Sequence, residues 1–135
     1  MSDDDGVSPR PGDPSPTALP VGWQVELDVD PGCVDALRGL TEQMVAVAAG
    51  EPGTMTYLRI FSADGTVMHA LEQYIDAQAA VVHLETFNDT FAAAFLALVS
   101  RRRCTVFGDT TPLLRTLLEP LNPTYLPAVL GFWHR

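Results

Sequence analysis

His83 is the side chain of this sequence best suited to move a proton near neutral pH, because histidine titrates in that range. It shares an apolar stripe with Ala80, Leu84 and Phe87, at the spacing of an amphipathic helix. The stripe predicts that His83 faces the interior, where a neutral ring can accept a proton from a bound substrate. The alternative is a core histidine that is hydrogen-bonded to a carboxylate or carbonyl and does no chemistry.

Glu72 and Tyr74 lie two residues apart in a strand-like segment, so their side chains share one face of the sheet. If that face meets the helix of His83, Glu72 can orient the imidazole and Tyr74 can donate a hydrogen bond to a substrate anion. We therefore consider His83, Glu72 and Tyr74 as catalytic candidates. The alternative for Glu72 is an architectural pair with a histidine or arginine, or a carboxylate at the rim of a dimer.

Aromatic residues and one arginine could form a binding wall near these groups. Tyr57 and Arg59 alternate onto one face of a strand, and Trp23 lies on another strand. With Phe87 and Phe91 they would suit a flat, small aromatic substrate such as a phenolate. Ordinary packing and a salt bridge between subunits are the alternative for the same residues.

The potential metal ligands are scattered along the chain. His69, His83 and His134 form no HExxH pattern, and Cys33 and Cys104 form no CxxC pair. We expect no metal and no resident cofactor. Two free thiols indicate a reducing compartment, which together with the lack of a signal peptide favours a cytoplasmic location.

The charge balance excludes several classes of protein. The 135 residues include 8 basic residues, all arginine, against 17 acidic ones, which gives a net charge of −9. Without lysine, a Walker A loop and a Schiff-base enzyme are impossible. So negative a domain repels nucleic acid, and no apolar run is long enough to span a membrane.

The elements that must position these residues follow a simple order. Residues 1–20 are rich in proline and aspartate and predict a disordered tail, and residues 21–135 predict one folded domain. We expect strands at 23–29, 54–61, 66–74 and 104–108, a helix at 34–49, a helix from the Asp76 cap to residue 100, a short helix at 113–121 and a final extended arm.

This order, β-α-β-β-α-β with an added C-terminal helix and arm, predicts an α+β fold of the ferredoxin-like type. If both main helices cover the same face, the other face of the sheet stays open. Two open faces packed together would bury each other, so we expect a homodimer that forms an α/β barrel.

The stretch from residue 51 to 87 resembles the antibiotic biosynthesis monooxygenase family. The matching features are Glu51-Pro52-Gly53-Thr54, Tyr57, Glu72-Gln73-Tyr74-Ile75-Asp76, Ala79, His83 and Phe87. The resemblance implies a dimeric α+β barrel, and several members oxidise anthrones, quinols or related phenols with O2 and without flavin, haem or metal. Haem-degrading relatives use an asparagine on the first strand, whereas Trp23 stands on that strand here and the asparagines, Asn88 and Asn122, lie elsewhere.

Three functions are compatible with these observations. The first is a cofactor-independent monooxygenase in which His83 is the base and Tyr57, Tyr74 and Arg59 stabilise the substrate anion. The second is a ligand-binding or structural barrel without turnover. The third is a non-oxidative isomerase or cyclase on the same fold.

Overall fold

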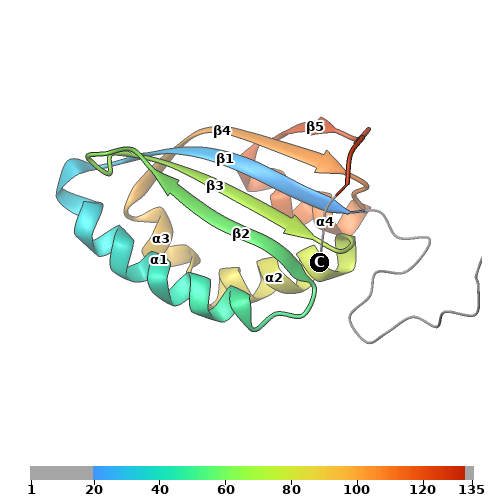
Figure 1. Ribbon diagram of the computed structural model, residues 1–135, viewed down its shortest axis with the longest axis horizontal. Coiled ribbons are helices and arrows are strands. Elements are labelled where there is room, and N and C mark those ends of the chain that lie inside the picture. Colours follow the sequence, from blue (N-terminus) through green and yellow to red (C-terminus); the bar gives the residue numbers. More distant parts are fainter. Residues whose placement is uncertain (1–19, 133–135) are drawn as a thin grey trace, which may run out of the picture.

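Five strands form one sheet in the computed structural model, which describes residues 20–132 (Figure 1). The strands are β1 (Val21–Val29), β2 (Thr54–Phe61), β3 (Val67–Tyr74), β4 (Val99–Gly108) and β5 (Thr124–Leu126). Their spatial order is β2-β3-β1-β4-β5; the pairs within β2-β3-β1-β4 are antiparallel, and β5 runs parallel to β4 at the edge. The first four strands have the order of a ferredoxin-like subunit, which confirms the predicted fold class.

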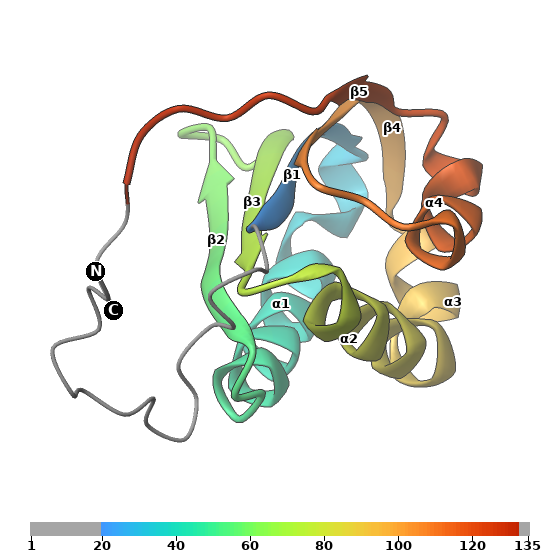
Figure 2. The same cartoon turned by 90° about the vertical axis from the view of Figure 1, so that its right-hand side faces the viewer.

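The helices cover one face of this sheet (Figure 2). They are α1 (Val34–Ala49), α2 (Ala77–Thr90), α3 (Ala92–Leu96) and α4 (Pro112–Leu118). Short 3-10 turns precede α1 at Pro31–Cys33 and follow α4 at Glu119–Leu121. The added helix and arm are confirmed as α4, which packs beside α2, and as β5 with the residues that follow it.

Side-chain caps fix where the helices begin. The Asp76 carboxylate accepts a hydrogen bond of 2.9 Å from the Ala79 amide at the start of α2, as the sequence predicts. Thr111 caps α4 in the same way, with Pro112 in the first turn. Asp30 caps the 3-10 turn, and α1 begins only at Val34.

Alternation along the strands gives the sheet two faces of different character. On β1, Trp23 and Leu27 are buried beneath the helices, and Asp28 points the other way and is exposed. We call the helix-covered side the inner face and the opposite side the open face. On the open face of β2, Leu58 and Ile60 are 50% and 53% exposed.

The second half of the chain differs from the prediction in one place. The apolar spacing of Phe91, Phe95, Leu98 and Val99 predicts a helix to residue 100, but β4 already begins at Val99 and is ten residues long. The helix ends at Thr90 and resumes as α3, because Phe91 leaves the helical region at φ −121°. Short apolar runs fit either periodicity, and pairing with β1 decides in favour of the strand.

The predicted tail lies outside the described residues except for Pro20, and the division into a tail and a folded domain at 21–135 stays a prediction. No helix among residues 20–132 has the length and apolar character needed to cross a membrane.

Candidate active site

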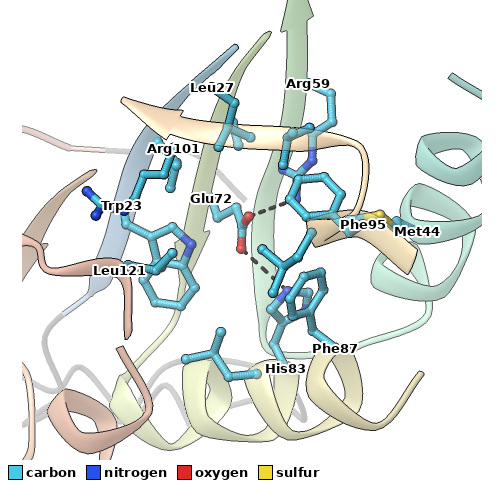
Figure 3. A pocket seen from close by; sticks show the side chains of 15 residues that line it. Trp23, Leu27, Met44, Arg59, Glu72, His83, Phe87, Phe95, Arg101 and Leu121 are labelled. Atoms are coloured by element: carbon cyan, nitrogen blue, oxygen red, sulfur yellow. Dashed lines mark hydrogen bonds and ion pairs between the residues drawn. The ribbon is translucent and has the colours of Figure 1, made fainter. Parts of the chain in front are cut away.

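A cavity of about 100 Å³ lies between the inner face and the helices (Figure 3). Its walls are formed by Trp23, Val25, Leu27, Met44, Arg59, Ala70, Glu72, His83, Leu84, Phe87, Phe95, Leu96, Val99, Arg101 and Leu121. Most of these side chains are apolar, and a few polar groups converge among them, as in small-molecule binding sites. We call this space the inner cavity.

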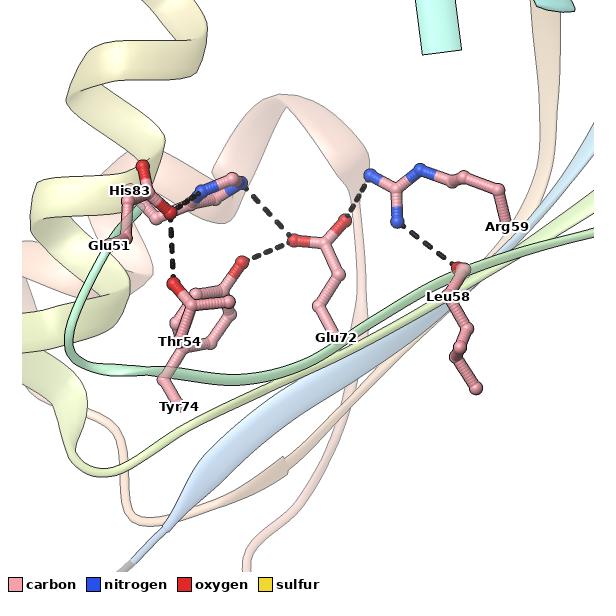
Figure 4. A network of polar contacts seen from close by, with 7 residues as sticks. All are labelled: Glu51, Thr54, Leu58, Arg59, Glu72, Tyr74 and His83. Carbon is pink, nitrogen blue, oxygen red and sulfur yellow. Dashed lines mark hydrogen bonds and ion pairs between the residues drawn. The ribbon is translucent and has the colours of Figure 1, made fainter. Parts of the chain in front are cut away.

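His83 lies on α2 and is almost fully buried, with its ring held from one side by Glu51. Its Nδ1 is 2.8 Å from Oε1 of Glu51 (Figure 4). The same carboxylate oxygen accepts a 2.9 Å hydrogen bond from the Thr54 hydroxyl. Glu51 lies just after Gly50, which caps α1, and Thr54 begins β2, so the short turn between these elements fixes the orientation of the imidazole.

Glu72 lies on β3 at the other ring nitrogen and is buried with three polar partners. Its Oε1 is 3.4 Å from Nε2 of His83 and accepts a 2.5 Å hydrogen bond from the Tyr74 hydroxyl. Its Oε2 accepts a 2.8 Å charge-assisted hydrogen bond from Arg59, whose side chain is 5% exposed. Burying a carboxylate is costly unless partners of this kind compensate for the lost water.

The hydrogen bonds around His83 determine which of its ring nitrogens can accept a proton. Because Glu51 accepts at Nδ1, the neutral ring carries its hydrogen there, and its Nε2 is an acceptor. Nε2 and Oε1 of Glu72 then present two acceptors 3.4 Å apart on residues of the cavity wall. A substrate hydroxyl that approaches both atoms from the cavity side has an acceptor in reach on each residue, and a protonated ring could return the proton.

The two tyrosines beside His83 stay protonated. Burial raises the pKa of Tyr74 well above its ordinary value, and the negative charge of Glu72 adds to the shift. Burial likewise raises the pKa of Tyr57, against the opposing effect of Arg59. Tyr74 is therefore a permanent donor to Glu72. Tyr57 packs edge-on against the His83 ring, and the Arg59 guanidinium carbon lies 3.7 Å from the centre of the Tyr57 ring.

Arg59 has a donor to spare. Its Nη2 pairs with Glu72, and its Nη1 donates to the Leu58 carbonyl at 3.2 Å. Its Nε is buried and has no hydrogen-bond partner among the described residues. Buried donors normally have a hydrogen-bond acceptor. This N–H group is therefore available to donate a hydrogen bond to a bound ligand.

The structure brings together most of the residues that the sequence singled out. Trp23, Arg59, Glu72, His83 and Phe87 line the inner cavity. The rings of Trp23 and Tyr74 pack 4.9 Å apart, so Tyr74 and Tyr57 form a layer behind the lining. Phe91 is buried at the end of α2 but is not among the lining residues.

Glu51 is the site residue to which the sequence reasoning gave no role. That reasoning assigned the orienting task to Glu72, whereas the closer partner of the ring is Glu51, at Nδ1. The available signal was its place in the Glu51-Pro52-Gly53-Thr54 motif, where a lone carboxylate sits in a turn between a helix and a strand.

The remaining histidines lie apart from this cluster. His69 is on the open face, 4.0 Å from Glu26, and His134 is outside the described residues. Among residues 20–132, no group of three or more histidine, cysteine, aspartate or glutamate side chains is arranged to hold a metal ion.

Solved structures share this fold. MupZ from Pseudomonas fluorescens is 24% identical with a TM-score of 0.74, and the match covers 95% of this chain and 96% of MupZ. A proposed antibiotic biosynthesis monooxygenase from Nitrosomonas europaea is 22% identical with a TM-score of 0.59, over 70% of this chain and 93% of that one. SnoaB, a cofactor-independent oxygenase from Streptomyces nogalater, is 18% identical with a TM-score of 0.58, over 67% and 92%.

These likenesses show the fold of the chain. No protein-family model matches the sequence, and the search of curated proteins found no match. Any function must therefore be inferred from the residues of the inner cavity.

Proposed function

We propose that the inner cavity is the active site of a cofactor-independent monooxygenase that oxidises a phenolic, anthrone or quinol-like substrate with O2. The observation that carries this proposal is the buried pair of His83 Nε2 and Glu72 Oε1, two acceptors on the wall of an otherwise apolar cavity. Supporting it, SnoaB has the same fold and is described as a cofactor-independent oxygenase.

The first step would be removal of a proton from the substrate. Nε2 of His83 accepts the proton, while Glu51 holds the other ring nitrogen and stabilises the imidazolium that forms. The resulting substrate anion is electron-rich and lies near Arg59, whose unpaired Nε–H group can donate a hydrogen bond to the developing oxyanion.

The oxidation then needs no further reductant. The anion passes an electron to O2, and recombination and loss of water complete the reaction. For an anthrone, one oxygen atom becomes the new carbonyl, and the other leaves as water with the two hydrogens of the oxidised methylene. The apolar walls, including Trp23 and Phe87, would hold the flat ring and exclude bulk water.

A second function has a specific observation in its favour. One imidazole placed between two carboxylates, with the Tyr74 phenol beside it, can both take up and return a proton without any redox step. That arrangement would serve an isomerase or a cyclase as well as an oxygenase.

Oxygen dependence separates the two functions. O2 uptake by metal-stripped protein is measured with a panel of anthrones, naphthols and hydroquinones, together with product formation under strict anaerobiosis. We expect uptake above the spontaneous rate, falling about 100-fold or more in His83→Ala. Product formed without O2 would support the acid–base function instead, and neither activity across the panel would contradict both.

His69→Ala is the matched control, because it removes the same side chain from the open face. Its uptake should equal that of the unmodified protein. If both histidine variants lost activity alike, the assignment of the base to His83 would be wrong.

A further inference from the structure

Three consecutive arginines on β4 point in different directions because the strand carries a β-bulge. The register with β1 runs from Glu26 opposite Arg103 to Leu27 opposite Arg101, so Arg102 is the extra residue. Without the bulge, strict alternation from Cys104 on the inner face would turn Arg102 inward and Arg101 outward. The bulge reverses this, as such irregularities do when they redirect a side chain.

Two of the three arginines have acidic partners. Nε of Arg102 lies 3.2 Å from the Asp28 carboxylate, and Nε of Arg103 lies 3.8 Å from that of Glu26. Both partners stand on β1. Arg101 is exposed and lines the inner cavity, and its side chain has neither an ion pair nor a hydrogen bond with any of the described residues.

The unpaired cation stands at the opposite side of the cavity from the acid–base cluster. Arg59 comes from β2 and Arg101 from β4, with β3 and β1 between them. Three strand spacings of about 4.8 Å separate these strands by roughly 14 Å. Figure 3 shows Leu27 between the two arginines, Trp23 beside Arg101 and Phe87 beside His83.

The inner cavity therefore has two polar ends that suit different chemical groups of a ligand. At one end, the unpaired Nε–H group of buried Arg59 calls for an oxygen acceptor beside His83 and Glu72. At the other end, Arg101 is exposed, so water solvates its guanidinium until a ligand binds, and the planar fork is free to pair with a carboxylate. In a protein of net charge −9, which repels anions at long range, such a local cation sets the choice of ligand.

We propose that Arg101 anchors the carboxylate of an elongated, mainly apolar hydroxy acid, whose hydroxyl lies at His83 and Glu72. The proposal rests on the proposed function only in taking the inner cavity as the substrate site. It adds the substrate class, which is a carboxylic acid with its charge far from the reacting oxygen. The β-bulge in β4 then serves to turn Arg101 toward the inner cavity.

The test compares a matched pair of ligands by calorimetry without O2. 6-Hydroxy-2-naphthoic acid carries a hydroxyl and a carboxylate at opposite ends of a flat ring, and 6-hydroxy-2-naphthamide differs only in lacking the charge. We expect the acid to bind at least tenfold more tightly than the amide, with a preference that weakens as salt is raised.

Arg101→Gln should abolish this preference, and Arg101→Lys should keep part of it. Arg102→Gln is the control, because it removes the same charge from the neighbouring residue outside the cavity. It should preserve the full preference. Melting temperatures of the three variants check that each is folded.

Equal affinity for the acid and the amide, a preference that survives in Arg101→Gln, or no binding of either ligand at millimolar concentration would overturn the proposal. Because binding is measured without turnover, a protein that binds the acid through Arg101 but takes up no O2 would refute only the oxygenase. One that oxidises neutral phenols without favouring acids would refute only the anchor.

Discussion

The two faces of strands β2 and β3 each carry a few side chains of the kind usually found on the other. On the inner face, Arg59 and Glu72 are buried as an ion pair. On the open face of the same β2 strand, Leu58 and Ile60 are half exposed. Buried ion pairs rarely stabilise a fold more than apolar residues would, so the inner pair indicates a site with a chemical task. Exposed apolar residues on a sheet indicate a surface that another molecule covers.

The largest effect should come from breaking the inner ion pair. Glu72→Ala leaves the buried Arg59 without its carboxylate and the Tyr74 hydroxyl without its acceptor. We expect a loss of about 3–5 kcal/mol in the free energy of unfolding, measured by urea denaturation at a fixed protein concentration.

Glu26→Ala is the matched control on the open face, where the carboxylate pairs with an exposed Arg103. In protein diluted to the monomer it should cost less than about 1 kcal/mol, because solvent screens exposed pairs. Similar losses in the two variants would mean that the ion pair on the inner face contributes no more to stability than the one on the open face.

Negative charges introduced on the open face should weaken dimerisation. We expect the unmodified protein to be a homodimer joined by this face, and Leu58→Asp together with Ile60→Asp should raise the dimer dissociation constant at least about 100-fold, or ~2.7 kcal/mol. Sedimentation equilibrium measures this constant. Leu113→Asp on α4, at 54% exposure, is the control and should leave it unchanged. A protein that is monomeric from the start, or a double variant that still dimerises fully, would contradict the assignment.

A smaller effect should follow from loosening the ring of His83. Glu51→Gln keeps an acceptor near Nδ1 but removes the charge, and we expect kcat to fall about 10- to 100-fold, by ~1.4–2.7 kcal/mol. KM should stay constant, because Glu51 does not line the inner cavity. The 15N chemical shifts of the His83 ring, which report where its hydrogen sits, provide a readout that needs no substrate.

Glu85→Gln, on the exposed side of the same helix, is the control for this variant. It should change neither kcat nor the ring shifts. Ring shifts that remain unaltered in Glu51→Gln would mean that Glu51 does not fix the tautomer.

What the sequence predicts well is local. The strand at β1 and the Asp76 cap depend on residues a few positions apart, and the structure confirms them. The contact of Glu51 with His83 spans 32 residues and depends on how the turn after α1 approaches α2. The direction of Arg101 depends on one extra residue in β4, which no periodicity records. Sequence reasoning thus identified the face of the site and Glu72 as a neighbour of His83, but not the contact with Glu51 or the direction of Arg101.

The smallest effect concerns water exclusion at the inner face of β4. Burial raises the pKa of the Cys104 thiol from 9.0 to about 11. Between these values the unfolded chain has lost the proton and the folded chain keeps it, so stability is complete below about pH 9 and falls as the pH rises toward 11. The urea midpoint between pH 8 and 10 should decline less steeply in Cys104→Ala. Val106→Ala, which trims a buried neighbour on the same strand but removes no ionisable group, should keep the original slope. Parallel curves for Cys104→Ala and the unmodified protein would mean that water reaches this face, and the contrast between the two faces would then rest on the ion pair alone.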